Sequence, residues 1–140
     1  MSFQVKFGTE HLDWSELCLL FERAPLGRRE PARLRRAAEN SHLVCSAYDG
    51  DTLIGFARAL TDGEYQSAIY DMVVLPEYQG RGVGKTVMNA LLAALPTGTV
   101  LIYVVPGKEG FYAKLGFNAL LTGMGRFPDL NEARRKRLIP

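Results

Sequence analysis

Hydrophobic and polar positions follow regular periods along most of the chain. Residues 3–7 alternate between apolar and polar, which is typical of a strand with one buried face. Apolar residues from Trp14 to Phe21 recur every three or four positions, which predicts a helix that ends before Pro25. Residues 31–38 begin with proline and carry a thin apolar stripe, which predicts a second and mostly solvated helix. The first third of the chain is therefore expected to form a strand followed by two helices.

The middle of the chain predicts antiparallel strands followed by a long helix. The apolar-rich segments 43–48 and 52–60 are joined by Asp49-Gly50, a pair that tolerates the positive φ angles of a tight hairpin turn. A further strand is expected over 67–75. Apolar residues at helical spacing over 83–95 predict the strongest amphipathic helix of the chain.

The last third predicts a crossover to a parallel strand. Residues 100–105 are apolar without alternation, which favours a central strand covered on both faces and parallel to the strand before the long helix. A short helix over 106–115, closed by Gly116, is expected next, and then a last strand over 117–121. Capping-box spacing predicts a final basic helix over 129–137.

Composition limits the classes of protein that fit. The chain has 140 residues, 47% hydrophobic and 23% charged, so a single folded domain over residues 1–140 is expected. The net charge of +2 is too balanced to indicate a nucleic-acid partner, and no apolar run is long enough to suggest a membrane span. Two cysteines among apolar neighbours fit a reducing compartment, and we expect a cytoplasmic location. With only two histidines, we expect no metal site.

The segment between the strand at 67–75 and the long helix carries the strongest chemical indication. It contains three glycines within five residues, at positions 80, 82 and 84. Such glycines let the backbone approach a ligand closely, and the N–H groups of a helix N-terminus attract anions such as phosphate. The segment therefore predicts a phosphate-binding turn.

Three phosphate-binding motifs compete for this segment. A Walker A loop requires a glycine where Gln79 stands, five residues before the triplet Gly84-Lys85-Thr86. A dinucleotide fingerprint requires a third glycine at the position of Lys85. The pattern Gln/Arg-x-x-Gly-x-Gly/Ala is met in full by Gln79, Gly82 and Gly84.

This pattern resembles the central motif of the GNAT superfamily of N-acetyltransferases. The similarity runs from Asp71 to Gly84, and the segment Phe111-Tyr112-Ala113-Lys114-Leu115-Gly116-Phe117 is similar to a downstream motif of the same family. The resemblance implies an α/β fold of the GNAT type. Its mixed central sheet would have six to seven strands, splayed between strands 4 and 5 and flanked by about four helices.

The resemblance also implies how acetyl-CoA would bind without a metal. The pyrophosphate would lie on the glycine turn, and the pantetheine would pair with the strand before it like an added strand. A backbone N–H near Val73 would hold the thioester carbonyl as negative charge develops on it. The implied coenzyme-binding residues are Met72, Val73, Val74, Gln79, Gly80, Arg81, Gly82, Val83, Gly84, Lys85, Thr86 and Tyr112.

Direct transfer of an acetyl group to an amine needs an acid and a base. By its place in the downstream motif, Tyr112 is the expected proton donor to the departing thiolate, with a core aromatic as the alternative. Asp71 is a candidate base if burial raises its pKa, and a structural carboxylate otherwise. Glu64, Tyr70 and a chain of water molecules are further candidates.

The expected activity is that of an acetyl-CoA-dependent N-acetyltransferase. The acceptor would be a small-molecule amine, of an arylalkylamine kind if aromatic walls line its pocket, or a protein amine. The alternative is a non-catalytic acyl-CoA-binding module. Many family members have a coenzyme-binding asparagine after the fifth strand, where this chain has Val105-Pro106-Gly107-Lys108. For Lys108, either a contact with a coenzyme phosphate or a solvated lysine is expected. A homodimer is a further expectation.

Overall fold

The computed structural model describes residues 2–140, and these divide into two compact units that we describe separately. The first unit extends to Ile102 and the second runs from Tyr103 to Pro140. The expectation of a single domain stays a prediction. None of the helices in the described residues is long and apolar enough to cross a membrane.

The first unit contains a five-stranded sheet with the order β1-β2-β3-β4-β5. Neighbouring strands are antiparallel except β4 and β5, which are parallel as predicted. The strands are β1 (Gln4–Phe7), β2 (Leu43–Asp49), β3 (Thr52–Thr61), β4 (Gln66–Val74) and β5 (Thr99–Leu101). The turn between β2 and β3 has Gly50 at a φ of 59°, which confirms the predicted hairpin.

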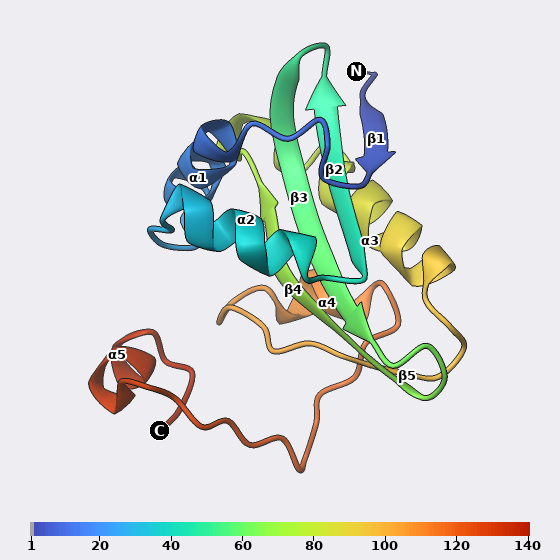
Figure 1. The fold of residues 1–140 in the computed structure, drawn as a ribbon. Helices are drawn as coiled ribbons and strands as arrows, with labels where there is room; N and C mark the ends of the chain where they lie inside the picture. Colours follow the sequence, from blue (N-terminus) through green and yellow to red (C-terminus); the bar gives the residue numbers. More distant parts are fainter. Residues whose placement is uncertain (1) are drawn as a thin grey trace. The chain divides into compact units, whose positions relative to one another are not determined.

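Helices cover both faces of this sheet (Figure 1). They are α1 (Trp14–Arg23), α2 (Pro31–Glu39) and α3 (Val83–Ala94). The ring of Phe56 on β3 packs edge-on against Phe21 of α1, with centroids 5.9 Å apart. The preceding residue, Gly55, faces α3, because a Cβ added there would lie 3.0 Å from Val83 Cγ1. Since successive strand residues point to opposite faces, α1 and α3 lie on opposite sides of β3.

The two faces together form the core of the first unit. Its largest fully buried side chains come from α1, the three central strands and α3, and they include Phe21, Phe56, Leu17, Leu20, Leu53, Ile54, Ile69, Met88 and Leu91. The helical and strand periods of the sequence account for these positions. The core therefore holds β4 and the first turn of α3 firmly beside each other.

Two predicted strand segments differ from the structure. The segment 100–105 forms only the short strand Thr99–Leu101, and Leu101 is 40% exposed rather than covered on both faces. Residues 117–121 are not in a strand, so the described chain has five strands rather than six or seven. Apolar composition alone does not make a strand, because each strand also needs a neighbour whose backbone groups it can pair with.

The second unit contains two short helices, α4 (Glu109–Ala113) and α5 (Leu130–Arg135). Gly116 follows α4 at a φ of 92°, as the prediction of a left-handed closing residue requires. The carboxylate of Asp129 accepts a hydrogen bond from the N–H of Glu132 at 3.1 Å and so caps α5. Both predicted helices are thus present, each shorter than expected.

Candidate functional site

Among residues 2–140, no strand pairs with the outer edge of β4 over more than half of its length. Its ladder with β5 consists of three residue pairs and ends at Ala68 and Leu101, whereas its ladder with β3 continues to Val74. This arrangement is consistent with a sheet that splays between β4 and β5. An unpaired edge of this kind can accept an extended, amide-bearing ligand as an added strand.

The predicted pantetheine-binding residues lie along this edge. The N–H of Leu75 donates to the carbonyl of Ile54 at 2.8 Å and is therefore directed toward β3. Because the peptide direction alternates along a strand, the peptide groups of Val74 are directed to the outer edge. Val73 pairs with Phe56 and is only 4% exposed, so its side chain belongs to the core.

A β-bulge interrupts β4 just before these residues. Phe56 pairs with Val73 and Arg58 pairs with Tyr70, so two residues of β4, Asp71 and Met72, face a single residue of β3. Asp71 has a φ of 59°, a left-handed conformation that aspartate tolerates better than most residues. The bulge bends the strand and re-aims its backbone beside the unpaired edge.

The glycine turn connects β4 to α3. A short 3₁₀ helix, η1 (Pro76–Tyr78), is followed by Gly80 and Gly82 at φ angles of 78° and 86°. A Cβ added at either glycine would meet no heavy atom within 4 Å, so the space above the turn is open. The Tyr78 hydroxyl donates to Asp49 Oδ2 at 2.6 Å and anchors the turn to the β2–β3 hairpin.

Side chains of the turn are also fixed in place. The Gln79 side-chain amide donates to the carbonyl of Val74 at 3.1 Å, on the outer edge of β4. The guanidinium of Arg81 lies over the Tyr78 ring, 5.5 Å from its centroid. These contacts connect the turn to the strand edge and leave a basic side chain at the start of α3.

The N-terminus of α3 suits an anion. Asp13 caps α1 and Glu30 caps α2, whereas Gly82 precedes α3 without a side-chain cap. The first helical bond is donated by the N–H of Thr86 to the carbonyl of Gly82 at 3.0 Å, so the preceding N–H groups have no partner within the helix. Lys85 lies in this turn, where a cation is unfavourable for the helix dipole by itself. A bound anion such as a phosphate would offset both features.

Asp71 is a buried carboxylate held by two arginines. Its side chain is 9% exposed and accepts hydrogen bonds from Arg29 at 3.0 and 3.2 Å and from Arg58 at 2.7 Å. Burial raises the pKa of Asp71, but the hydrogen bonds and charges of the two arginines outweigh burial and lower the pKa below its ordinary value. The expectation of a raised pKa at Asp71 is therefore wrong, whereas its role in catalysis stays a prediction.

Tyr112 lies in α4 of the second unit. Its side chain is buried, with ring centroids 4.9 Å from Phe111 and 6.0 Å from Phe117. Burial raises the pKa of Tyr112 to about 12, so its hydroxyl keeps its proton at neutral pH. Lys108, which directly precedes α4, is exposed. Tyr112 thus carries a proton at neutral pH, which a proton donor requires.

The other candidate bases, Glu64 and Tyr70, and both histidines make contacts within the fold. Glu64 is exposed in the turn before β4, where its N–H donates to Asp62 Oδ1 at 2.8 Å. The guanidinium of Arg58 lies 5.4 Å from the ring centroid of Tyr70. His11 Nε2 is 2.8 Å from the Ser46 hydroxyl, and His42 Nδ1 accepts from the N–H of Thr61 at 3.2 Å. No group of three or more metal-binding side chains occurs in residues 2–140.

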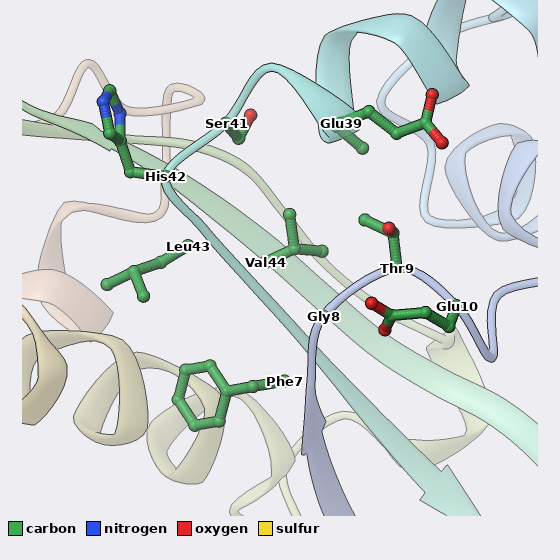
Figure 2. A pocket seen from close by; sticks show the side chains of 10 residues that line it. Phe7, Gly8, Thr9, Glu10, Glu39, Ser41, His42, Leu43 and Val44 are labelled. Atoms are coloured by element: carbon green, nitrogen blue, oxygen red, sulfur yellow. The ribbon is translucent and has the colours of Figure 1, made fainter.

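A surface pocket of about 410 Å³ lies elsewhere on the first unit, between the end of β1 and the α2–β2 connection. Figure 2 shows Phe7 and Glu10 on one side of this pocket and Ser41 and His42 on the other. None of the predicted coenzyme-binding or catalytic residues lines it. The strand edge and the glycine turn therefore remain the candidate site on chemical grounds.

Together, the unpaired edge of β4 and the uncapped N-terminus of α3 define an α/β protein suited to an extended, phosphate-bearing ligand. Comparison with known proteins identifies the family. Residues 9–117 match the Acetyltransferase (GNAT) family, and the chain belongs to this family.

Several similar proteins are also named N-acetyltransferases. Serotonin N-acetyltransferase 2, chloroplastic, from Oryza sativa subsp. japonica is 36% identical over 122 residues, which are 82% of this chain and 61% of the rice protein. GCN5-related N-acetyltransferase 1, chloroplastic, from Arabidopsis thaliana is 30% identical over 96% of this chain and 71% of its own length. The chain thus spans about three fifths of the rice relative.

Solved structures agree with the fold. A GNAT-family acetyltransferase from Streptococcus pneumoniae TIGR4 superposes with a TM-score of 0.79 at 26% identity, covering 90% of this chain and 98% of that one. The GNAT fold expected from the sequence is thereby confirmed, with the smaller strand count given above.

The partners of Asp71 were not found from the sequence. Arg29 is 42 positions away in the α1–α2 connection, and no periodicity relates the two residues. The sequence does indicate that Arg58 has a buried partner, because Arg58 is a charged residue between the buried alanines Ala57 and Ala59 of β3. A charge in such a strand requires a buried partner.

Proposed function

We propose that this protein is an acetyl-CoA-dependent N-acetyltransferase that transfers an acetyl group directly from the thioester to a primary amine. The observation that carries the proposal is the continuity of the unpaired β4 edge, the open glycine turn and the uncapped N-terminus of α3. The edge offers peptide groups for the amides of pantetheine. The turn and the helix offer N–H groups for a diphosphate.

The reaction forms a C–N bond and breaks the C–S bond of the thioester. The acceptor ammonium first loses a proton to a water molecule, and its nitrogen then attacks the carbonyl carbon while negative charge develops on the carbonyl oxygen. The outward-facing N–H of Val74 would donate a hydrogen bond to that oxygen and stabilise the charge. The nitrogen gives its second proton to water as the C–S bond breaks. The leaving thiolate takes a proton, for which Tyr112 is the proposed donor because its phenol stays neutral well above pH 7.

The class of acceptor amine is also part of the proposal. An arylalkylamine such as serotonin is the first acceptor to test, because the rice relative bears the name of a serotonin N-acetyltransferase. Amino acids and peptides complete the panel, since a protein amine is the other expected acceptor.

The decisive experiment combines binding and turnover. Acetyl-CoA is titrated into the protein in a calorimeter, and thiol release is followed with a panel of amines, amino acids and peptides. Cys18 and Cys45 are both buried, and burial raises the pKa of Cys45 to about 11, so the native protein contributes little background thiol. Absence of both binding and thiol release contradicts the proposal.

One observation favours a second candidate, a non-catalytic acyl-CoA-binding module. Asp71, one of the candidate bases, is held in an ion cluster with two arginines. A protein of this kind would bind acetyl-CoA with ordinary affinity but release no thiol with any acceptor. The same pair of measurements therefore separates the two candidates.

A further inference from the structure

The ion cluster around Asp71 joins three elements of the first unit. Asp71 lies at the β4 bulge, Arg58 on the neighbouring strand β3, and Arg29 in the connection between α1 and α2. Arg58 also donates to the Ser41 hydroxyl at 3.2 Å, just beyond the end of α2. The Asp71 carboxylate thus links the sheet to the segment between α1 and α2.

Both oxygens of Asp71 are occupied by these arginines. Arg29 Nη2 donates to Oδ1 at 3.0 Å, and Arg29 Nη1 donates to Oδ2 at 3.2 Å. Arg58 Nε donates to the same Oδ2 at 2.7 Å. A carboxylate with three charge-assisted hydrogen bonds stays ionised and is a poor proton acceptor.

The α1–α2 connection is held at further points. The guanidinium of Arg29 also lies over the Phe21 ring of α1, 4.9 Å from its centroid. At the other end of the connection, Arg23 forms an ion pair with Glu77 of the glycine turn. That pair is half exposed and is expected to contribute little. Asp71 and Arg29, at 9% and 34% side-chain exposure, form the stronger attachment.

On this geometry we propose that Asp71 is a positioning residue, not the base, and that it holds the α1–α2 connection through Arg29 so that the acceptor amine binds correctly beside β4. This inference rests on the proposed function, because it assigns a role in acetyl transfer. In this proposal the α1–α2 connection lies on the side of the bulge from which the acceptor amine approaches. Arg58 anchors the carboxylate from the sheet.

The test uses Asp71→Asn and Arg29→Gln, with Arg28→Gln as the matched control. Asparagine keeps the size of the side chain and tolerates the left-handed backbone of the bulge. Arg28 is the neighbouring arginine, with a side chain 92% exposed and an ion pair only to the exposed Glu22. Acetyl-CoA affinity, the acceptor KM and kcat, and the pH profile of kcat/KM are measured with an acceptor found in the amine panel. Circular dichroism checks that each variant is folded.

If Asp71 positions the connection, Asp71→Asn and Arg29→Gln each raise the acceptor KM about tenfold and change kcat by less than about threefold. The double variant is then no worse than Asp71→Asn, because the two residues act as one unit. Acetyl-CoA affinity is unchanged, Arg28→Gln behaves as wild type, and Arg29→Lys recovers part of the loss. The acidic limb of the pH profile, where kcat/KM falls at low pH, stays at the same pH in Arg29→Gln.

A general base predicts different results. Loss of a base lowers kcat by about 10²–10⁴-fold and removes the acidic limb in Asp71→Asn. Arg29→Gln then shifts that limb to higher pH, because the carboxylate loses a cation. Either result in an active wild-type protein overturns the positioning role alone. A wild-type protein that neither binds acetyl-CoA nor turns over any amine overturns the proposed function first. If Asp71→Asn does not fold, the milder Arg29→Gln decides by the same KM, kcat and pH criteria.

Discussion

Replacement of Gly82 by alanine tests the glycine turn most directly. Gly82 has a φ of 86° and a ψ of 4°, and an added Cβ would meet no heavy atom within 4 Å. The cost is therefore that of the left-handed backbone itself, about 1–2 kcal/mol for a residue with a Cβ. If the turn keeps its conformation, this cost lowers the free energy of unfolding and reduces Tm by about 3–7 °C.

The same free energy can affect the affinity for acetyl-CoA instead. If the turn relaxes to a negative φ in the free protein, stability is preserved, but binding must restore the left-handed turn. The affinity then falls by up to about 5- to 30-fold, the equivalent of 1–2 kcal/mol. Thermal unfolding and calorimetry on Gly82→Ala therefore have to be read together. Gly82→Asn is the matched control, because asparagine tolerates this conformation and loses less in both measurements. An alanine variant with unchanged Tm and unchanged affinity, or an asparagine variant as impaired as alanine, would refute the reasoning.

Three further predictions concern the core, the proton donor and the ion cluster. Phe56→Ala removes a side chain that is 0% exposed, and urea unfolding should show a loss of about 3–5 kcal/mol. Leu19→Ala, at a position 58% exposed, should change stability by less than about 0.5 kcal/mol, and equal losses would contradict the packing described. In steady-state kinetics Tyr112→Phe should lower kcat without changing acetyl-CoA affinity, and an unchanged kcat would remove Tyr112 from catalysis. The pKa of Asp71 is lowered in the folded protein from an ordinary value of 3.8. The stability that Asp71 contributes is therefore present above that value and is lost as pH falls through the lower, folded pKa. The Tm difference between wild type and Asp71→Asn should be full at pH 7 and shrink below about pH 3.8, and a difference that does not change with pH would contradict the ion cluster.

Local sequence patterns determined most of the first unit. The helix over Val83–Ala94 follows from apolar residues at helical spacing, because such a stripe is buried only when the segment is helical. Asp49-Gly50 identified the β2–β3 hairpin, and Gly80 and Gly82 of the glycine turn marked positions at positive φ. Each of these features depends on residues close together in the chain, so they could be predicted without coordinates.

Only the tertiary structure decided the strand ends and the state of Asp71. Whether residues 100–105 and 117–121 form strands depends on neighbours that supply hydrogen bonds, and the structure pairs only Thr99–Leu101. The pKa of Asp71 depends on Arg29 and Arg58, which the fold brings from 42 and 13 positions away. Burial alone predicts a raised pKa, and burial together with two cations produces a lowered one. The sequence could therefore identify the carboxylate as a candidate site residue, but its charge state follows from contacts that exist only after folding.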